Sequence, residues 1–398
     1  MRFLLLLTKF CKTTQFSLFK FTLCNVVVNS LMLKACFVFN MAPKYVSASY
    51  LLFDKELDVK WCFGSNNTDI KEMDHSLLKD VRVYPTKELK KGYILSGINE
   101  VAREKDIKNY VLIGDPTCWS MWVLPKLIRI YNPKASIYFW SHGWYGKESR
   151  LKAWIKKCFF KQANGVFLYG NYAKKLMIKE GFRTDSLFTI HNSLDHERQV
   201  NLRNTLNKSD IYIQHFNNNY PVLIFIGRLT PVKKLNQVIE AVSILKAKGE
   251  HYNLVFVGDG SEKENLQQQV NQLNFNDNVW FYGACYDEHL NAQLIYNADL
   301  CVAPGNVGLT AMHTMVYGTP VLTHNDFKWQ MPEFEAIVEG ETGCFFERDS
   351  VTSLSESIST WFFANNEKRE QVRSACYHEI DENWTPEFEL NVLKQVLK

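Results

Sequence analysis

The stretch PVLIFIGRLTPVKK, residues 221–234, decides the fold. It begins with the apolar run PVLIFIG, which is typical of a strand buried on both faces of a parallel sheet. The turn that follows carries Arg228 and Lys233, and ligands of doubly wound sheets bind just beyond the carboxyl ends of the strands. A planar guanidinium and a mobile ammonium suit phosphate oxygens, so this turn is a candidate phosphate site. The alternative is a basic turn that only faces solvent.

The rest of the C-terminal half alternates strand and helix patterns. Strand candidates are NLVFVG (253–258), VWFYG (279–283), LCVAP (300–304) and PVLTH (320–324), with helical patterns at 234–249, 262–273, 287–297 and 307–317. Such alternation predicts an α/β fold with a doubly wound parallel sheet. Gly227, Gly258 and Gly260 stand at strand ends, where a bulky ligand needs close approach to the backbone.

The N-terminal half carries a second series of strand patterns. These are LKACFVFN (33–40), LDVKWCF (57–63), NYVLIG (109–114), ASIYFW (135–140), GVFLY (165–169) and SLFTIH (186–191). A chain of 398 residues is long for one hydrophobic core, so two domains are expected. The polar segment from 201 interrupts the pattern. We predict Rossmann-like domains at 32–200 and 221–383, a linker at 201–220 and a terminal helix at 384–398.

The net charge of +4 is divided unevenly between the two halves. Lys and Arg against Asp and Glu give +10 for residues 32–200 and −10 for residues 201–398. This asymmetry suggests that the N-terminal half faces an anionic partner, although chance partition of surface charge is the alternative. We expect no nucleic acid among the partners. The 10 cysteines form no C-x-x-C pair and no zinc pattern, which predicts buried thiols in a cytoplasmic protein without a metal site.

Residues 1–31 are apolar and basic, but Lys9, Lys12 and Lys20 interrupt the apolar run. The longest uncharged part, 21–33, is too short to cross a bilayer, and no clear cleavage site follows it. We favour a start codon assigned too early, with Met32 opening the first domain. A membrane-surface anchor is the alternative.

The segment APGNVGLTAMHTMVYGTPV, residues 303–321, places a Pro–Gly turn before a helix. We expect this helix to begin near 306 and to offer free N–H groups from Asn306, Val307, Gly308 and Leu309. Free N–H groups and the helix dipole bind phosphate at such a position. An ordinary strand-to-helix turn is the alternative.

Taken together, these motifs resemble those of family-4 glycosyltransferases, which have the GT-B fold of two Rossmann-like domains facing a central cleft. The resemblance runs from about Met32 to Lys398 and is strongest over 221–345. In that family a G-R-L-x-x-x-K segment holds the diphosphate of the donor, so the resemblance assigns this role to Arg228 and Lys233.

Further family motifs correspond to VGDG at 257–260, to residues 305–321 and to EAIVEGETG at 335–343. The donor-binding residues implied by the resemblance are Gly227, Arg228, Lys233, Gly258, Gly260, Asn306, Val307, Gly308, Leu309, His313 and Glu335. One departure stands out, because the family's Glu-x7-Glu pair falls on Gly305 and His313. An imidazole can bond one ribose hydroxyl but cannot hold two as a carboxylate does, and a structural role for His313 is the alternative.

In the N-terminal half, SHGWYGKE at 141–148 resembles the family's His–Gly turn facing the cleft. The resemblance places His142 near the transferred sugar or its phosphate and makes it a catalytic candidate beside Arg228 and Lys233. A structural histidine is the alternative. Asp115, at the end of a predicted strand, is a further cleft candidate.

The segment KESRLKAWIKKCFFKQ, residues 147–162, is an amphipathic helix candidate. Its apolar stripe is Leu151, Trp154, Ile155, Cys158 and Phe159, and lysines and arginines surround this stripe. The helix either packs its stripe into the core or rests on an anionic membrane.

The resemblance implies a retaining, metal-independent glycosyltransferase without a cofactor, whose last helix crosses back onto the first domain. Its donor would be a nucleotide-diphosphate sugar, UDP-linked, and its acceptor a glycan or a polyprenyl-diphosphate-linked glycan of surface polysaccharide synthesis. We expect a cytoplasmic protein, in part peripheral on the cytoplasmic face of the membrane. Two alternatives stay open: a catalytically silent GT-B scaffold, which the missing Glu pair favours, and a sugar-nucleotide epimerase.

Overall fold

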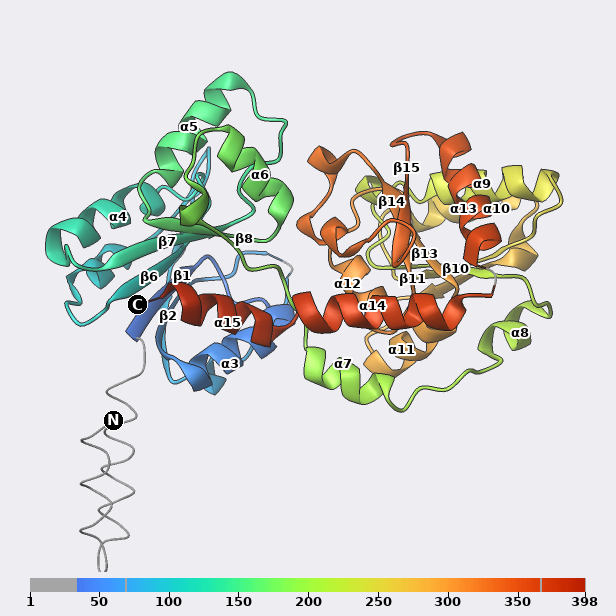
Figure 1. Ribbon diagram of the computed structural model, residues 1–398, viewed down its shortest axis with the longest axis horizontal. Helices are drawn as coiled ribbons and strands as arrows, with labels where there is room; N and C mark the ends of the chain where they lie inside the picture. Colours follow the sequence, from blue (N-terminus) through green and yellow to red (C-terminus); the bar gives the residue numbers. More distant parts are fainter. Residues whose placement is uncertain (1–33, 69, 366, 398) are drawn as a thin grey trace, which may run out of the picture.

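The computed structural model describes residues 34–68, 70–365 and 367–397, and the expectations for residues 1–31 lie outside this part. Two α/β lobes stand side by side, each built on its own parallel sheet (Figure 1). Within the described part of the chain, every helix is too short or too polar to span a lipid bilayer.

The N-terminal sheet has seven parallel strands in the order β3-β2-β1-β6-β7-β8-β9. The strands are β1 (Lys34–Phe39), β2 (Asp58–Gly64), β3 (Asp80–Tyr84), β6 (Asn109–Ile113), β7 (Ser136–Ser141), β8 (Gly165–Leu168) and β9 (Leu187–Thr189). The helices are α3 (Ser47–Glu56), α4 (Ser120–Tyr131), α5 (Arg150–Phe160) and α6 (Asn171–Lys179). All the strands predicted in this half are confirmed. The sequence does not predict the edge strand β3 or the small hairpin of β4 (Thr86–Glu88) and β5 (Tyr93–Leu95), because β3 and β4 are largely polar or exposed and β5 is only three residues long.

The C-terminal sheet has six parallel strands in the order β12-β11-β10-β13-β14-β15. They are β10 (Val222–Ile226), β11 (Asn253–Val257), β12 (Val279–Gly283), β13 (Leu300–Ala303), β14 (Val321–His324) and β15 (Gly343–Phe346). The helices are α9 (Asn236–Ala247), α10 (Lys263–Gln272), α11 (Glu288–Asn297), α12 (Leu309–Met315), α13 (Val351–Asn365) and α14 (Arg369–Asn383). The strand PVLIFIG is confirmed as β10, whose residues are all buried at the centre of the sheet.

Both sheets are doubly wound, which confirms the predicted fold class. In each sheet the strand order reverses beside the first strand, between β1 and β6 and between β10 and β13. A crevice opens beyond the carboxyl ends of the strands at such a reversal, and ligands bind there. The fold therefore provides two crevices, one in each lobe.

The segments that join the lobes also pack into them. The predicted linker 201–220 contains α8 (Ile211–Phe216), which follows α7 (His196–Arg203) and buries Tyr212 and Phe216 in the C-terminal core. The terminal helix α15 (Pro386–Val396) lies against α3 of the N-terminal lobe (Figure 1). Leu390 and Leu393 of α15 complete the hydrophobic core on that side of the sheet.

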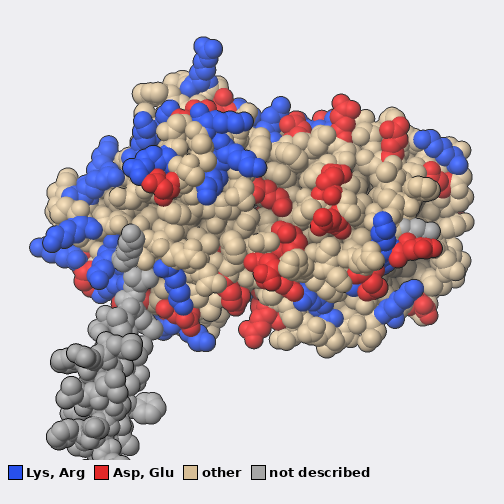
Figure 2. All heavy atoms as spheres, viewed as in Figure 1, with Lys and Arg blue, Asp and Glu red and all other residues tan. Residues whose placement is uncertain are grey.

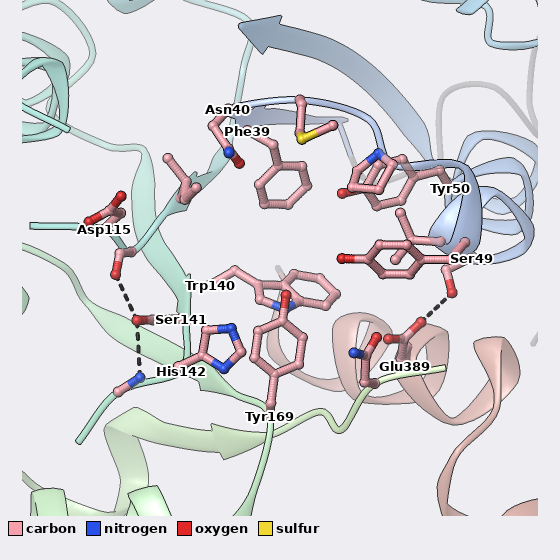
Figure 3. Close-up of a pocket in the computed structure, with 18 of the residues that line it drawn as sticks. Phe39, Asn40, Ser49, Tyr50, Asp115, Trp140, Ser141, His142, Tyr169 and Glu389 are labelled. Atoms are coloured by element: carbon pink, nitrogen blue, oxygen red, sulfur yellow. Dashed lines mark hydrogen bonds between the residues drawn. The ribbon is translucent and has the colours of Figure 1, made fainter. Parts of the chain in front are cut away.

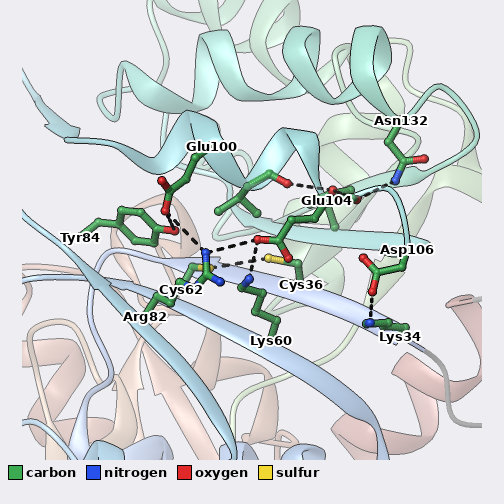
Figure 4. Close-up of polar contacts among 12 residues, drawn as sticks. Lys34, Cys36, Lys60, Cys62, Arg82, Tyr84, Glu100, Glu104, Asp106 and Asn132 are labelled. Carbon is green, nitrogen blue, oxygen red and sulfur yellow. Dashed lines mark hydrogen bonds and ion pairs between the residues drawn. The ribbon is translucent and has the colours of Figure 1, made fainter.

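Charged side chains form ion pairs beside β1 and β2 of the N-terminal sheet (Figure 4). Glu104 accepts from the buried Lys60 and lies 3.5 Å from Arg82, while Asp106 pairs with Lys34. The thiols of Cys36 and Cys62 lie 3.8 Å apart, and burial raises the pKa of the Cys36 thiol well above its usual range. The cysteines of the described residues are free, and most are buried, as predicted.

Candidate functional site

The turn after β10 carries Arg228 and brings Lys233 to the loop that follows β13. The Lys233 ammonium donates to the backbone oxygen of Asn306 at 2.7 Å and to its Oδ1 at 2.9 Å. Burial lowers the pKa of Lys233 to about 8; the buried Glu333 opposes this shift and Arg228 adds to it. Arg228 is exposed, and within the described residues it has no carboxylate partner. Lys233 is therefore fixed on this loop, and Arg228 is a neighbouring exposed cation that is free to take an anionic ligand.

The glycines at the strand ends allow the loops to pack against one another. A Cβ on Gly258 would lie 1.9 Å from the Gly227 oxygen, and one on Gly260 would lie 2.3 Å from the Leu229 oxygen. Loop packing thus accounts for Gly258 and Gly260, and their role as donor-binding positions stays a prediction. A Cβ on Gly305 would lie 2.0 Å from the Val232 oxygen. The backbone of the cationic turn occupies the space that a glutamate at 305 would need.

The helix expected near 306 begins later, since α12 starts at Leu309. Gly308 precedes it with φ +52°, a conformation that glycine adopts at little cost. The N–H of Val307 donates to Gln330 Oε1 at 2.9 Å, so this group is not free for a ligand as predicted. Asn306 contributes through its oxygens, which fix Lys233.

A cavity of about 440 Å³ lies between the lobes, and we call it the interdomain cavity. Gly227, Leu309 and His313 line it from the C-terminal lobe, together with Glu288 at the start of α11. His313 Nε2 lies 3.0 Å from Glu288 Oε1, and the Tyr317 hydroxyl donates to the same oxygen at 2.7 Å. Burial would raise the pKa of Glu288, but these hydrogen bonds lower it to about 2. An ionised carboxylate is thus fixed in the wall of the cavity beside His313.

A second cavity of about 400 Å³ opens at the carboxyl ends of β1, β6 and β7 (Figure 3), and we call it the N-domain cavity. Aromatic rings form much of its wall: Phe39, Tyr50, Trp140 and Tyr169. Asp115 and His142 also line it. Tyr45 lines both cavities, so the two lie side by side.

His142 is a neutral polar group in the wall of the N-domain cavity. Burial, with the charge of Lys156, lowers its pKa to about 4, and Asp115 opposes this shift. Its buried Nδ1 has no hydrogen-bond partner among the residues that the structure describes. In Figure 3 the ring of His142 lies beside Tyr169, and the ring centroids are 4.7 Å apart. The structure therefore places both sequence-predicted cleft residues, His142 and Asp115, at one cavity.

Two carboxylates reach from the C-terminal lobe to the N-terminal lobe. Glu335 accepts from the backbone N–H groups of Asn171 and Tyr172, both at 2.6 Å, at the start of α6. Glu335, predicted as a donor ligand, is instead occupied by these amides. Glu333 accepts from Asn192 at 2.9 Å, and burial raises its pKa.

Sequence reasoning missed Glu288 and Glu333. Glu288 follows the predicted strand VWFYG, and a carboxylate at the start of the next helix is a usable signal because strand ends of one sheet converge. Glu333 lies two residues before the assigned Glu335. Only packing distinguishes Glu333 from its neighbours, since its side chain is 3% exposed and bonds Asn192 where the two lobes meet.

Residues 207–378 match the family model "Glycosyl transferases group 1". A putative glycosyltransferase, EpsD of Bacillus subtilis, is 30% identical over 125 residues, which cover 31% of each chain. A GDP-mannose-dependent phosphatidylinositol dimannoside mannosyltransferase of Mycobacterium tuberculosis is 31% identical over 25% of this chain and 26% of its own length. The matched segments thus span about a third or less of these curated relatives.

Solved structures show the same fold over nearly the whole chain. Anabaena Alr3699/HepE in complex with UDP superposes with a TM-score of 0.68 at 17% identity, covering 91% of this chain and 99% of its own. The lipopolysaccharide outer core galactosyltransferase WaaB gives a TM-score of 0.67 at 14% identity, with coverage of 91% and 99%. At these identities the likeness establishes the GT-B fold, which confirms the predicted architecture.

Proposed function

We propose that this protein transfers a sugar from a nucleotide-diphosphate sugar to a glycan or lipid-linked acceptor, because residues 207–378 match the Glycosyl transferases group 1 family model. The observation that carries the proposal is a pair of neighbouring cations, Lys233 held by Asn306 after β13 and the exposed Arg228 near it. Negative charge grows on the diphosphate as the glycosidic bond breaks, and preorganised cations stabilise that charge.

UDP is the nucleotide we favour. The support comes from the Anabaena relative, which was crystallised with UDP. The interdomain cavity of about 440 Å³ has the size of a small-molecule site. We place the nucleotide there, with the diphosphate extending past Gly227, which lines the cavity, toward Arg228 and Lys233, which do not line it.

In the resembling family, a carboxylate binds the ribose hydroxyls, and His313 stands in its place here. Glu288 takes over that hydroxyl-binding role. Its ionised carboxylate is held by His313 and Tyr317 in the wall of the cavity. A carboxylate accepts from two neighbouring hydroxyl groups, which a lone imidazole cannot do. The loss of the Glu pair from the sequence is therefore compatible with donor binding.

The acceptor enters the N-domain cavity next to the donor. Its hydroxyl oxygen bonds to the anomeric carbon of the sugar while the bond from that carbon to the β-phosphate oxygen breaks. The hydroxyl attacks on the face from which the phosphate leaves and gives its proton to that phosphate, so the anomeric configuration is retained. The family resemblance implies that this step needs no metal. His142, neutral above about pH 4, holds a sugar hydroxyl by hydrogen bonding at the edge of this reaction.

A silent scaffold with the same fold is the second candidate, and the substitutions at Gly305 and His313 favour it. Mass spectrometry with a panel of UDP and GDP sugars separates the two. We expect slow hydrolysis of one donor, and transfer when a polyprenyl-diphosphate glycan is added. A scaffold would leave every donor intact. An epimerase would instead return a donor with one stereocentre changed and would need no acceptor.

A further inference from the structure

Helix α5 leaves most of its apolar stripe in water. Leu151 is 66% exposed and Trp154 is 64% exposed, and Ile155 and Cys158 are exposed beside them. The spacing of these positions places them on one face of the helix. The core-packed interpretation of the stripe is therefore wrong for these residues and holds only for Phe159.

Basic side chains border this exposed face. Arg150, Lys152 and Lys161 are exposed, and Lys157 is half-buried. The sequence of α5 contains no acidic residue, and Glu148 just before it is paired with Lys156. Figure 2 shows the basic residues gathered over the N-terminal lobe, where α5 forms the upper rim in Figure 1. The face thus combines a central apolar strip with a cationic border.

The opposite face of the same helix belongs to the N-domain cavity. Lys156 and Phe160 line that cavity, and the Lys156 ammonium donates to the Gly143 oxygen at 2.6 Å. Lys156 also pairs with Glu148, so this side of α5 is fixed to the cavity wall. One rigid helix therefore joins the exposed apolar strip to the candidate acceptor cavity.

We propose that the exposed face of α5 rests on an anionic lipid bilayer. Leu151 and Trp154 enter the boundary between headgroups and acyl chains, while the long basic side chains reach the phosphate groups. A nucleic acid would neutralise the cations but would leave the apolar strip in water. Together with the proposed function, on which this step rests, the contact brings the N-domain cavity to the surface that carries a lipid-linked acceptor.

Sedimentation of the full chain with vesicles tests the contact. We expect wild-type protein to bind vesicles of phosphatidylcholine containing roughly one third phosphatidylglycerol, and to bind pure phosphatidylcholine weakly. High salt should weaken the binding. The double variant Leu151→Ser/Trp154→Ser should bind anionic vesicles roughly tenfold more weakly, because it loses the apolar part of the contact. Lys152→Gln/Lys157→Gln should lose the preference for anionic lipid.

The matched control is Phe363→Ser, since Phe363 on α13 is 90% exposed in the other lobe and should not affect binding. Circular dichroism checks that each variant folds. Residues 1–33 are present in every variant, so a difference between variants reports on α5. Equal binding by wild type and the Leu151→Ser/Trp154→Ser variant, or no vesicle binding by wild type, would overturn the proposal. Vesicle binding needs no turnover, so a protein that binds lipid but leaves all donors intact contradicts only the proposed function.

Discussion

Lys233 shows how local packing prepares a charge for a ligand. Its ammonium is held by two oxygens of Asn306, and burial weakens its hold on its proton. An anionic diphosphate at this place would restore that hold.

Loss of either cation should slow the reaction. We expect Arg228→Ala or Lys233→Ala to lower kcat by roughly 100-fold or more, as for other preorganised groups that stabilise transition-state charge. Steady-state kinetics on the donor found by mass spectrometry measures the effect. Lys234→Ala is the matched control, because the Lys234 ammonium pairs with Asp349 at the surface. Near-normal turnover in both test variants would show that the diphosphate lies elsewhere.

Donor affinity should fall as pH rises through about 8, the pKa of Lys233 in the free protein. The protonated form binds the diphosphate, so affinity is complete below that pH and decreases by up to about tenfold per pH unit above it. Calorimetric titration with the donor from about pH 7 to about pH 9.5 measures this change in affinity. Lys233→Arg should bind donor with little pH dependence over that range. The same pH dependence in Lys233→Arg would assign the titration to another group.

At the scale of elements, most strands and the helices α5, α9, α10, α11 and α15 followed from the sequence, but β15, α13, α14 and the start of α12 did not. Apolar runs such as PVLIFIG define buried strands by themselves. By contrast, α12 begins at Leu309 because the loop before it is held by Lys233 and Gln330. Glu335 matched a family motif, yet it bonds α6 of the other lobe. These outcomes depend on contacts between distant segments, which local sequence patterns do not contain.

The docking of α15 depends on the protonation of Glu389. This carboxyl is buried and bonded by Ser49 of α3 and by Ser193, and burial raises its pKa to about 8. The folded protein therefore binds a proton that the unfolded chain releases near pH 4.3 or so. The stability contributed by this proton is complete below the unfolded pKa and is lost as pH rises toward about 8.

We accordingly expect Glu389→Gln to stabilise the protein at high pH. The amide keeps the size of the side chain without its charge. At about pH 8.5 the free energy of unfolding of the variant should therefore exceed that of wild type by roughly 1–3 kcal/mol, which appears as a higher melting temperature. At about pH 4, the variant and wild type should have similar melting temperatures. Thermal unfolding followed by circular dichroism measures this. A constant difference across this range would exclude Glu389 as the cause.

At the scale of the whole molecule, the two lobes are held together on the side of α6. The carboxylate of Glu335 crosses from the C-terminal lobe to the first amides of α6, and Gly170 leaves room for it, since a Cβ there would lie 2.4 Å from Glu335 Oε1. Tyr172 also packs edge-on against Phe334. These contacts join the C-terminal lobe to α6 of the N-terminal lobe.

Removal of this contact should open the molecule. We expect Glu335→Ala to shift the balance between closed and open forms by about 2 kcal/mol, because two charge-assisted hydrogen bonds are lost. Small-angle scattering should then give a larger radius of gyration than for wild type. Glu341→Ala, at an exposed neighbouring position, should leave the radius unchanged. Identical scattering from Glu335→Ala and wild type would contradict a role in closure.

The most direct test of the central claim is calorimetric titration of the protein with UDP and GDP at pH 7 or so, below the pKa of Lys233. If the two cations hold a nucleotide diphosphate, one of these nucleotides should bind at a single site. Its affinity should fall roughly tenfold or more in Lys233→Ala and should also fall in Glu288→Gln. If neither nucleotide binds wild type, or if it binds both of these variants as tightly as wild type, the donor is not held where the account places it.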